Sequence, residues 1–71
     1  MRERAAEAVR SVAGTAGEVV VYRQGRRLLV VTSLAADPAI TVREAHALAS
    51  RVEDAVREAL AAVDDVIVEV R

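Results

Sequence analysis

The stretch that decides the fold is ITVREAHALASRVEDAVREALAAVDDVIVEV, residues 40–70. It opens with a capping box, in which the Thr41 hydroxyl can accept a hydrogen bond from the Glu44 amide and the Glu44 carboxylate can accept one from the Thr41 amide. Apolar residues then recur at helical spacing and predict a buried stripe at Ala45, Leu48, Ala49, Val52, Val56, Ala59, Leu60 and Val63. The pattern therefore predicts a helix from Thr41 to about Ala62.

A strand is expected directly after this helix. Asp64-Asp65 predict a turn, and residues 66–71, Val-Ile-Val-Glu-Val-Arg, are rich in β-branched residues. Val66, Val68 and Val70 should point to one face, with Ile67, Glu69 and Arg71 on the other. The stretch is therefore a helix–strand unit.

Two short β-branched segments lie upstream and predict a hairpin. Residues 18–23 and residues 27–35 flank Gln24-Gly25-Arg26, where the glycine can supply the positive φ of a tight turn. The segment Ala36-Asp37-Pro38-Ala39 is expected to be the loop that leads to the long helix.

A first helix is predicted over residues 3–13. Its apolar positions fall on one helical face: Ala5, Ala8, Val9, Val12 and Ala13. Gly14 and Gly17, with Thr15 and Ala16 between them, should end it. A strand, a helix and a strand in succession favour a right-handed parallel crossover. The fold class predicted is α+β: an αββαβ two-layer sandwich, with a mixed three-stranded sheet and both helices on one face.

This architecture leaves one face of the sheet uncovered. Apolar residues run consecutively through both hairpin strands, at Val19, Val20 and Val21 and again from Leu28 to Val31, so both faces receive them. An exposed apolar sheet face in a soluble protein usually marks an interface. The sequence therefore predicts a homodimer.

Composition limits the functions open to the chain. Its 71 residues contain no cysteine and one aromatic residue, Tyr22, and the formal net charge is −1. Disulfides and thiolate zinc sites are excluded, and no base-stacking platform for nucleic acid exists. The net charge gives no general reason to bind nucleic acid or anionic lipid. Because no apolar run approaches ~20 residues, no membrane insertion is expected, and a cytoplasmic setting follows.

Candidate chemical residues are few. His46, the only histidine, lies beside the buried stripe, and we expect a partly buried helix residue. It could alternatively bind a metal, with help from the carboxylates of Glu69, Asp64 or Asp65 or from a second chain. The other polar candidates have simpler structural explanations: Asp64-Asp65 as a turn, Arg26-Arg27 as a solvated turn, and Thr32 and Ser33 as strand residues. No nucleophile, base and orienting group can be assembled, so no catalytic residue is predicted and the chain is not expected to be an enzyme.

A family resemblance adds to this interpretation. The segment 40–56, with Glu44-Ala45-His46 and Val52-Glu53, resembles the cytosolic C-terminal dimerisation domain of cation diffusion facilitator transporters. The hairpin Tyr22-Arg23-Gln24-Gly25 and the last strand are similar too. The resemblance covers nearly the whole chain and implies a single cation-efflux dimerisation-type domain, residues 1–71, with a ferredoxin-like or metallochaperone-like fold.

The chain departs from that family where metal-binding members place their ligands. The matching positions are Glu18, Ser33, Glu69 and Arg71, and only His46 of the ligand set remains. The resemblance therefore implies the fold, the homodimer and a possible transmembrane partner domain of the same or a related transporter, but it predicts neither a cofactor nor tight zinc binding. The alternatives are a small zinc-type protein using His46 and a small ligand-binding ferredoxin-like domain.

Overall fold

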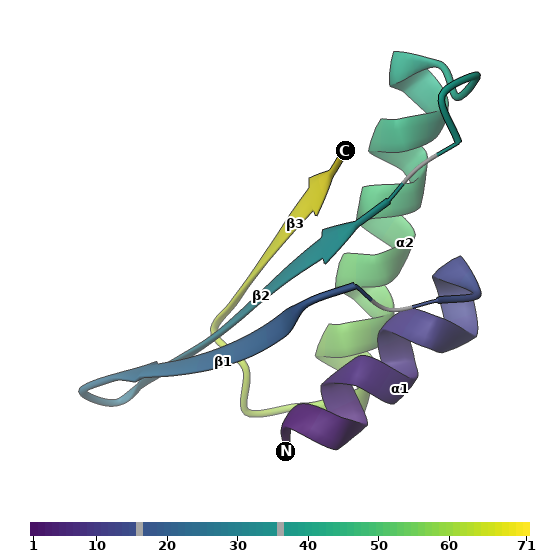
Figure 1. Ribbon diagram of the computed structural model, residues 1–71. Coiled ribbons are helices and arrows are strands. Elements are labelled where there is room, and N and C mark those ends of the chain that lie inside the picture. The colour runs from purple at the N-terminus through teal and green to yellow at the C-terminus, as the bar shows by residue number, and fades with distance from the viewer. Residues whose placement is uncertain (16, 36) are drawn as a thin grey trace.

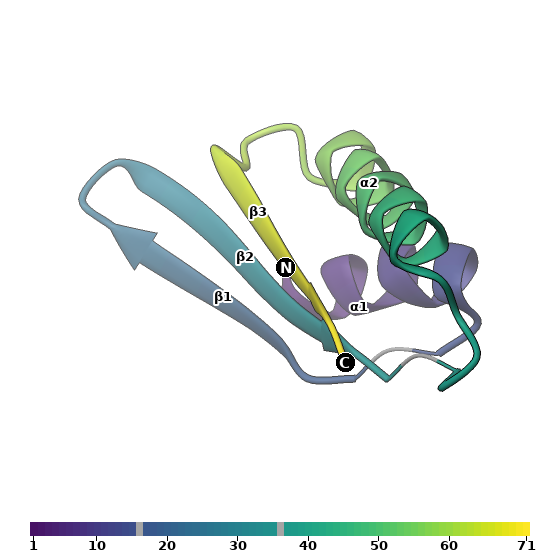
Figure 2. The same ribbon diagram turned by 90° about the horizontal axis from the view of Figure 1, so that it is seen from above.

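The computed structural model describes residues 1–15, 17–35 and 37–71. Its elements follow the predicted order: α1 (Arg2–Ala13), β1 (Val19–Gln24), β2 (Arg27–Leu34), α2 (Val42–Ala59) and β3 (Asp65–Val70). The sheet has the order β1-β2-β3, with β1 antiparallel and β3 parallel to β2. Both helices cover one side of this mixed sheet, which confirms the predicted αββαβ two-layer sandwich (Figures 1 and 2).

The element bounds differ slightly from the prediction. α2 ends at Ala59 rather than near Ala62, because Leu60 adopts φ −123° and ψ 82° and leaves the helical conformation. Leu60 and Val63 are nevertheless buried, so the last two residues of the predicted stripe pack from the connection after the helix. β3 begins at Asp65, which pairs with Leu29 in the parallel ladder. Ala16 and Ala36, which fall within the two predicted loops, lie outside the described residues.

The predicted capping box is present at the start of α2. The Glu44 amide donates to Thr41 Oγ1 at 3.1 Å, and the Thr41 amide donates to Glu44 Oε1 at 3.3 Å. These two bonds satisfy amides that a helix leaves without intrahelical acceptors. The cap fixes where the helix begins, and with it which residues face the sheet.

Replacing Thr41 with alanine is expected to lower the free energy of unfolding by ~1 kcal/mol, because the capping oxygen is lost. Urea denaturation followed by far-ultraviolet circular dichroism measures the change. Ser50→Ala is the control, since Ser50 is an exposed residue within α2 and no cap depends on it. Equal urea midpoints for wild type and Thr41→Ala would contradict the assigned cap.

The core between the helices and the sheet is built almost wholly from small aliphatic residues. Its buried members are Ala5, Val9, Val19, Leu28, Val30, Leu34, Val52, Val56, Leu60, Val63 and Val66. Ala5 is fully buried and Ala8 partly so, and such small side chains let two helices approach closely. A core of valine, leucine and alanine can therefore exclude water without aromatic rings.

The connection between α2 and β3 is pinned to the start of β2. Asp64 Oδ2 accepts a 2.6 Å hydrogen bond from the Leu28 amide, and the Asp64 amide donates to the Leu28 carbonyl at 2.8 Å. Arg57 Nη2 lies 3.7 Å from Asp65 Oδ1 and so links α2 to β3. These contacts help to set the register of β3, which decides which of its side chains reach the uncovered face.

Candidate functional site

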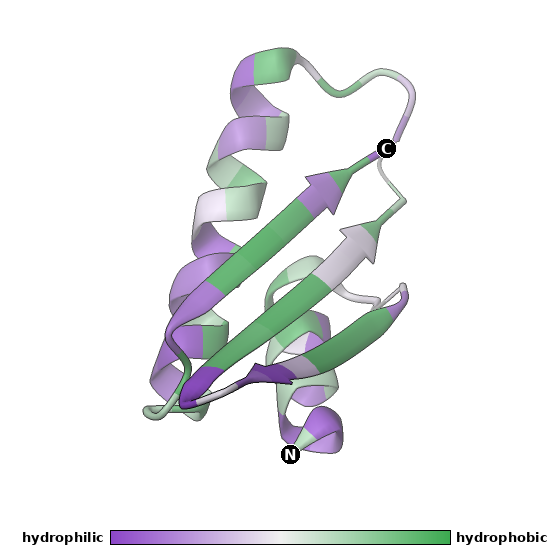
Figure 3. Cartoon of the chain, turned by 90° about the vertical axis from the view of Figure 1, so that its left-hand side faces the viewer, coloured by the Kyte–Doolittle hydropathy of each residue, from purple (hydrophilic) through white to green (hydrophobic). Residues whose placement is uncertain are grey.

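The face of the sheet that the helices leave uncovered is the main candidate site. The register places Val20 opposite Val31, and Val31 opposite Ile67, so one apolar row crosses all three strands. Tyr22 and Leu29 form the neighbouring pair on the same face. Figure 3 shows this face with the helices behind it. We call these five residues, Val20, Tyr22, Leu29, Val31 and Ile67, the open face.

The open face is accessible to solvent. Ile67 is 49% exposed and Tyr22 is 51% exposed, while Val20, Leu29 and Val31 are half-buried. The chain as a whole exposes 4858 Å², whereas a compact monomer of this mass exposes roughly 4300 Å². The excess is consistent with an uncovered sheet face and a projecting hairpin.

Polar residues border the open face at the end where β3 finishes. Glu69 lies opposite Ser33 in the β2–β3 ladder, and Arg71 Nε lies 3.2 Å from Glu69 Oε1. Asp65 lies on the same face near the other end of β3 and is held by Arg57. An apolar centre with a polar rim is the usual anatomy of a protein–protein interface.

The structure brings together most of the residues that the resemblance predicts to match the family's ligand positions. Glu18, Ser33 and Arg71 line a hollow of about 270 Å³ beside Gly17, and Glu69 joins them through its ion pair with Arg71. In this arrangement the Arg71 guanidinium already engages the Glu69 carboxylate. The cluster therefore has a cation of its own where the resemblance places a metal ligand.

His46 lies near the start of α2 and is not among the residues that line this hollow. It is exposed, so the expectation of a partly buried histidine is wrong. The reason is that the stripe facing the core passes through Ala45, Leu48 and Ala49, which leaves position 46 on the solvent side. Among residues 1–15, 17–35 and 37–71, no three His, Cys, Asp or Glu side chains are grouped closely enough to hold a metal ion.

The two hydroxyl residues of β2, Thr32 and Ser33, occupy ordinary strand positions. Thr32 is buried on the helix side of β2, and in the described part of the chain its Oγ1 has no hydrogen-bond partner. Ser33 faces the opposite side, beside Glu69. In the part of the chain that the structure describes, neither hydroxyl is hydrogen-bonded to a side chain that could act as its base.

Sequence reasoning missed the position of Ile67 beside Val31, and it missed one hollow. Ile67 follows from the strict alternation of β3, but its place beside Val31 depends on the parallel register. A groove of about 510 Å³ also runs between α1 and α2, with an alanine floor at Ala8, Ala55 and Ala59. The sequence alone does not predict which faces of α1 and α2 lie against each other to form this groove.

Comparison with known proteins decides the family. The family model for the cytoplasmic domain of cation efflux proteins matches residues 2–71. The chain belongs to this family. The resemblance noted from the Ala45-His46 helix is thereby confirmed. No match was found among curated proteins, and neither helix in the described part of this efflux-family domain is long and apolar enough to cross a membrane.

Solved structures with the same fold include several of the MamM CTD. A copper form has 21% identity and a TM-score of 0.86 and covers 97% of this chain and 78% of its own. A cadmium form of a variant has 21% identity and a TM-score of 0.86, with coverage of 97% and 88%. A double variant has 20% identity and a TM-score of 0.88, with coverage of 97% and 84%. At these identities the likeness shows the fold alone.

Proposed function

We propose that this cation-efflux-family domain is a non-catalytic homodimerisation and regulatory module, and that two copies associate through the open face. The observation that carries the proposal is the apolar row Val20–Val31–Ile67, which crosses the sheet opposite the helices. Burying such a row removes apolar surface from contact with water, which favours association. The same row is present on each copy, as a two-fold symmetric interface requires.

The size of the face suits this role. A stable interface takes roughly 800 Å² from each partner, and the molecule measures 39 × 18 × 18 Å. One broad side of a body with these dimensions can supply a footprint of that order. The rim residues Glu69 and Arg71 can remain hydrated at the edge of such an interface, so the dimer need not bury unpaired charges.

The whole chain, residues 1–71, would act as one such unit in the cytoplasm. The transmembrane domain of the same or a related transporter would be its second partner. Family membership supports this placement, since the matched model is that of a cytoplasmic domain.

Sedimentation equilibrium of the wild-type chain tests the dimer directly. We expect a species of twice the 7.6 kDa chain mass at a concentration of ~100 µM, near the limit of useful weak association. A single 7.6 kDa species at that concentration would contradict the proposal.

The proposed dimer does not depend on zinc. A closed zinc site needs about four converging ligands, and this chain supplies one histidine, which is exposed, and no cysteine. The resemblance implies that Arg71 occupies one family ligand position, where its positive charge would oppose the approach of a cation. We therefore propose that the metal-sensing chemistry implied by the resemblance is lost here, while the fold and the dimer are kept.

Micromolar zinc is expected to leave the melting temperature of chelator-treated protein unchanged. If a site existed, zinc at ~100 times its dissociation constant would add ~2.7 kcal/mol to the free energy of unfolding. A thermal melt would detect this as a shift of many degrees. The measurement compares wild type with His46→Ala. A large zinc-dependent shift that His46→Ala abolishes would restore the alternative of a zinc-binding protein.

A further inference from the structure

The hairpin formed by β1 and β2 reaches beyond the helix layer and ends in a cluster of arginines. Its tip projects away from both helices in two perpendicular views (Figures 1 and 2). Arg23, Arg26 and Arg27 fall within five consecutive residues there, and all three are exposed. We call these three residues the basic tip.

Few negative charges oppose the basic tip. The sequence has no acidic residue between Glu18 and Asp37. Two acids lie beside the tip half of the hairpin: Asp64, whose carboxylate accepts a hydrogen bond from the Leu28 amide, and Asp65, which lies opposite Leu29 with its carboxylate 3.7 Å from Arg57 Nη2. In the described part of the chain, no ion pair involves any arginine of the basic tip. Its positive charge is therefore left to act on a partner.

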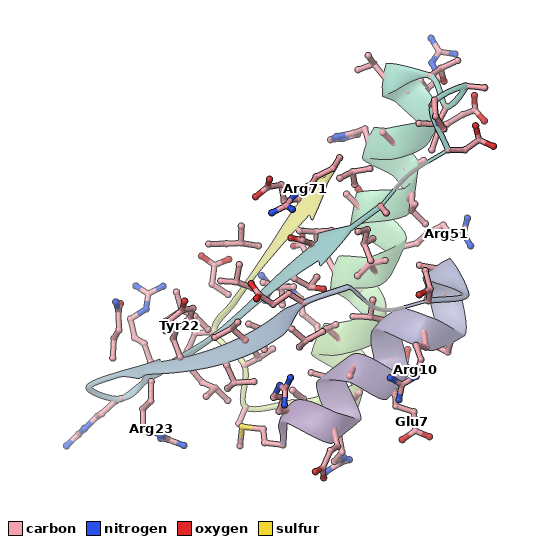
Figure 4. All side chains as sticks on the ribbon, viewed as in Figure 1. Glu7, Arg10, Tyr22, Arg23, Arg51 and Arg71 are labelled. Atoms are coloured by element: carbon pink, nitrogen blue, oxygen red, sulfur yellow. The ribbon has the colours of Figure 1, made fainter. Side chains whose placement is uncertain are left out.

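The basic tip is held in place by regular backbone pairing. Gln24 pairs with Arg27, Arg23 pairs with Leu28, and Gly25 closes the turn with φ +62°. Because residues alternate along a strand, Arg23 lies on the helix side of the hairpin and Arg27 on the opposite side. Figure 4 shows Arg23 pointing away from the hairpin, on the side opposite Tyr22. The tip thus presents positive charge in several directions.

The charge of the whole chain conceals this local asymmetry. The formal net charge is −1, so the chain without the three tip arginines carries −4. A body that is acidic, with a basic point at one end, is oriented by a negatively charged surface, which attracts the tip and repels the rest. The cytoplasmic leaflet of a membrane is such a surface, because it contains anionic phospholipids.

We propose that the basic tip binds the anionic phospholipid surface of the membrane and so orients the domain beneath its transporter. This inference rests on the proposed placement of the domain at the cytosolic side of a membrane. The interaction is adsorption to headgroups without insertion of the hairpin, because the tip residues Arg23–Arg27 contain no apolar side chain. Arginine suits this role, since its planar guanidinium can bond two phosphate oxygens at once.

The test measures the partition of the purified chain onto phospholipid vesicles by co-sedimentation. Vesicles of equal parts phosphatidylglycerol and phosphatidylcholine are compared with pure phosphatidylcholine vesicles, at low ionic strength. Each arginine near an anionic surface is worth about a fivefold change in partition, so the triple variant Arg23→Gln, Arg26→Gln, Arg27→Gln should partition roughly a hundredfold less than wild type. Added salt should weaken wild-type binding, because it screens the charges.

The matched control removes the same charge elsewhere. Arg4→Gln, Arg10→Gln, Arg51→Gln lowers the net charge equally at exposed positions on the helices, and it should retain most of the binding. Equal loss in both triple variants, equal partition onto neutral vesicles, or no wild-type binding at low salt would each overturn the proposal. A failure here leaves the sedimentation result for the dimer untouched, so the two proposals are separable.

Discussion

The chain with Ile67 replaced by aspartate is expected to sediment as a monomer at concentrations where wild type is a dimer. Ile67 lies at the β3 end of the apolar row, and two-fold symmetry would bring a second copy of the substitution into the same interface. Burying carboxylates without partners costs several kcal/mol. The dissociation constant of the dimer should therefore rise by about a hundredfold or more, measured by sedimentation equilibrium.

The folded monomer should tolerate this substitution. Ile67 is 49% exposed in the single chain, so its aspartate can remain hydrated when no second copy is bound. Val42→Asp is the control, because Val42 is 88% exposed in the first turn of α2, where an acid is favourable to the helix. A variant that keeps the wild-type dissociation constant would show that the open face is not the interface.

The second large effect is expected at Gly17, where an alanine should destabilise the fold by about 3 kcal/mol. A Cβ at this position would overlap the Ser33 carbonyl oxygen, which belongs to backbone and cannot swing aside as a flexible side chain could. The Ser33 amide also donates to the Glu18 carbonyl at 3.1 Å, so the two segments are held together at this point. Urea denaturation measures the loss.

Gly14→Ala gives the matched comparison for this prediction. Gly14 has φ +79°, but a Cβ added there would meet open space, so alanine costs only the strain of the left-handed conformation, about 1 kcal/mol. The steric overlap at Gly17 should cost clearly more. If the two variants unfold at the same urea concentration, the close approach between Gly17 and β2 is not a constraint on the fold.

The chain's elements are predictable because their signals are local. The capping box needs only Thr41 and Glu44, and the hairpin turn needs only Gly25 between two β-branched runs. The predicted end of α2 falls three residues late because Leu60 and Val63 continue the apolar spacing of the helix. Their burial comes from the connection packing under the sheet, and spacing alone cannot separate the two cases.

From the sequence, the open face can be predicted only in outline, from the excess of apolar residues in the hairpin strands. The runs Val19–Val21 and Leu28–Val31 indicate that both faces of the sheet are apolar, but they do not say which side chains lie on the uncovered one. His46 is predicted at the edge of the core, whereas the path of the stripe through Leu48 and Ala49 leaves it exposed. A rotation of about one helical position separates a partly buried His46 from an exposed one. The spacing of apolar residues does not locate the edge of the buried stripe to within one residue.

By itself, the sequence determined the element order and the start of α2, because each depends on residues close together in the chain. The mixed sheet followed from that order through the handedness of strand–helix–strand crossovers, and the family resemblance from the Ala45-His46 helix and its surroundings. The tertiary structure decided the features that depend on pairing between distant segments. The parallel register of β3 with β2, fixed in part by the Asp64 contacts with Leu28, places Ile67 beside Val31 and completes the open face. The same folding brings Glu18, Ser33 and Arg71 around one hollow and carries Arg23, Arg26 and Arg27 beyond the helices. The turn fixes the register of the β1–β2 hairpin, whereas the register of β3 depends on contacts between segments that are distant in sequence.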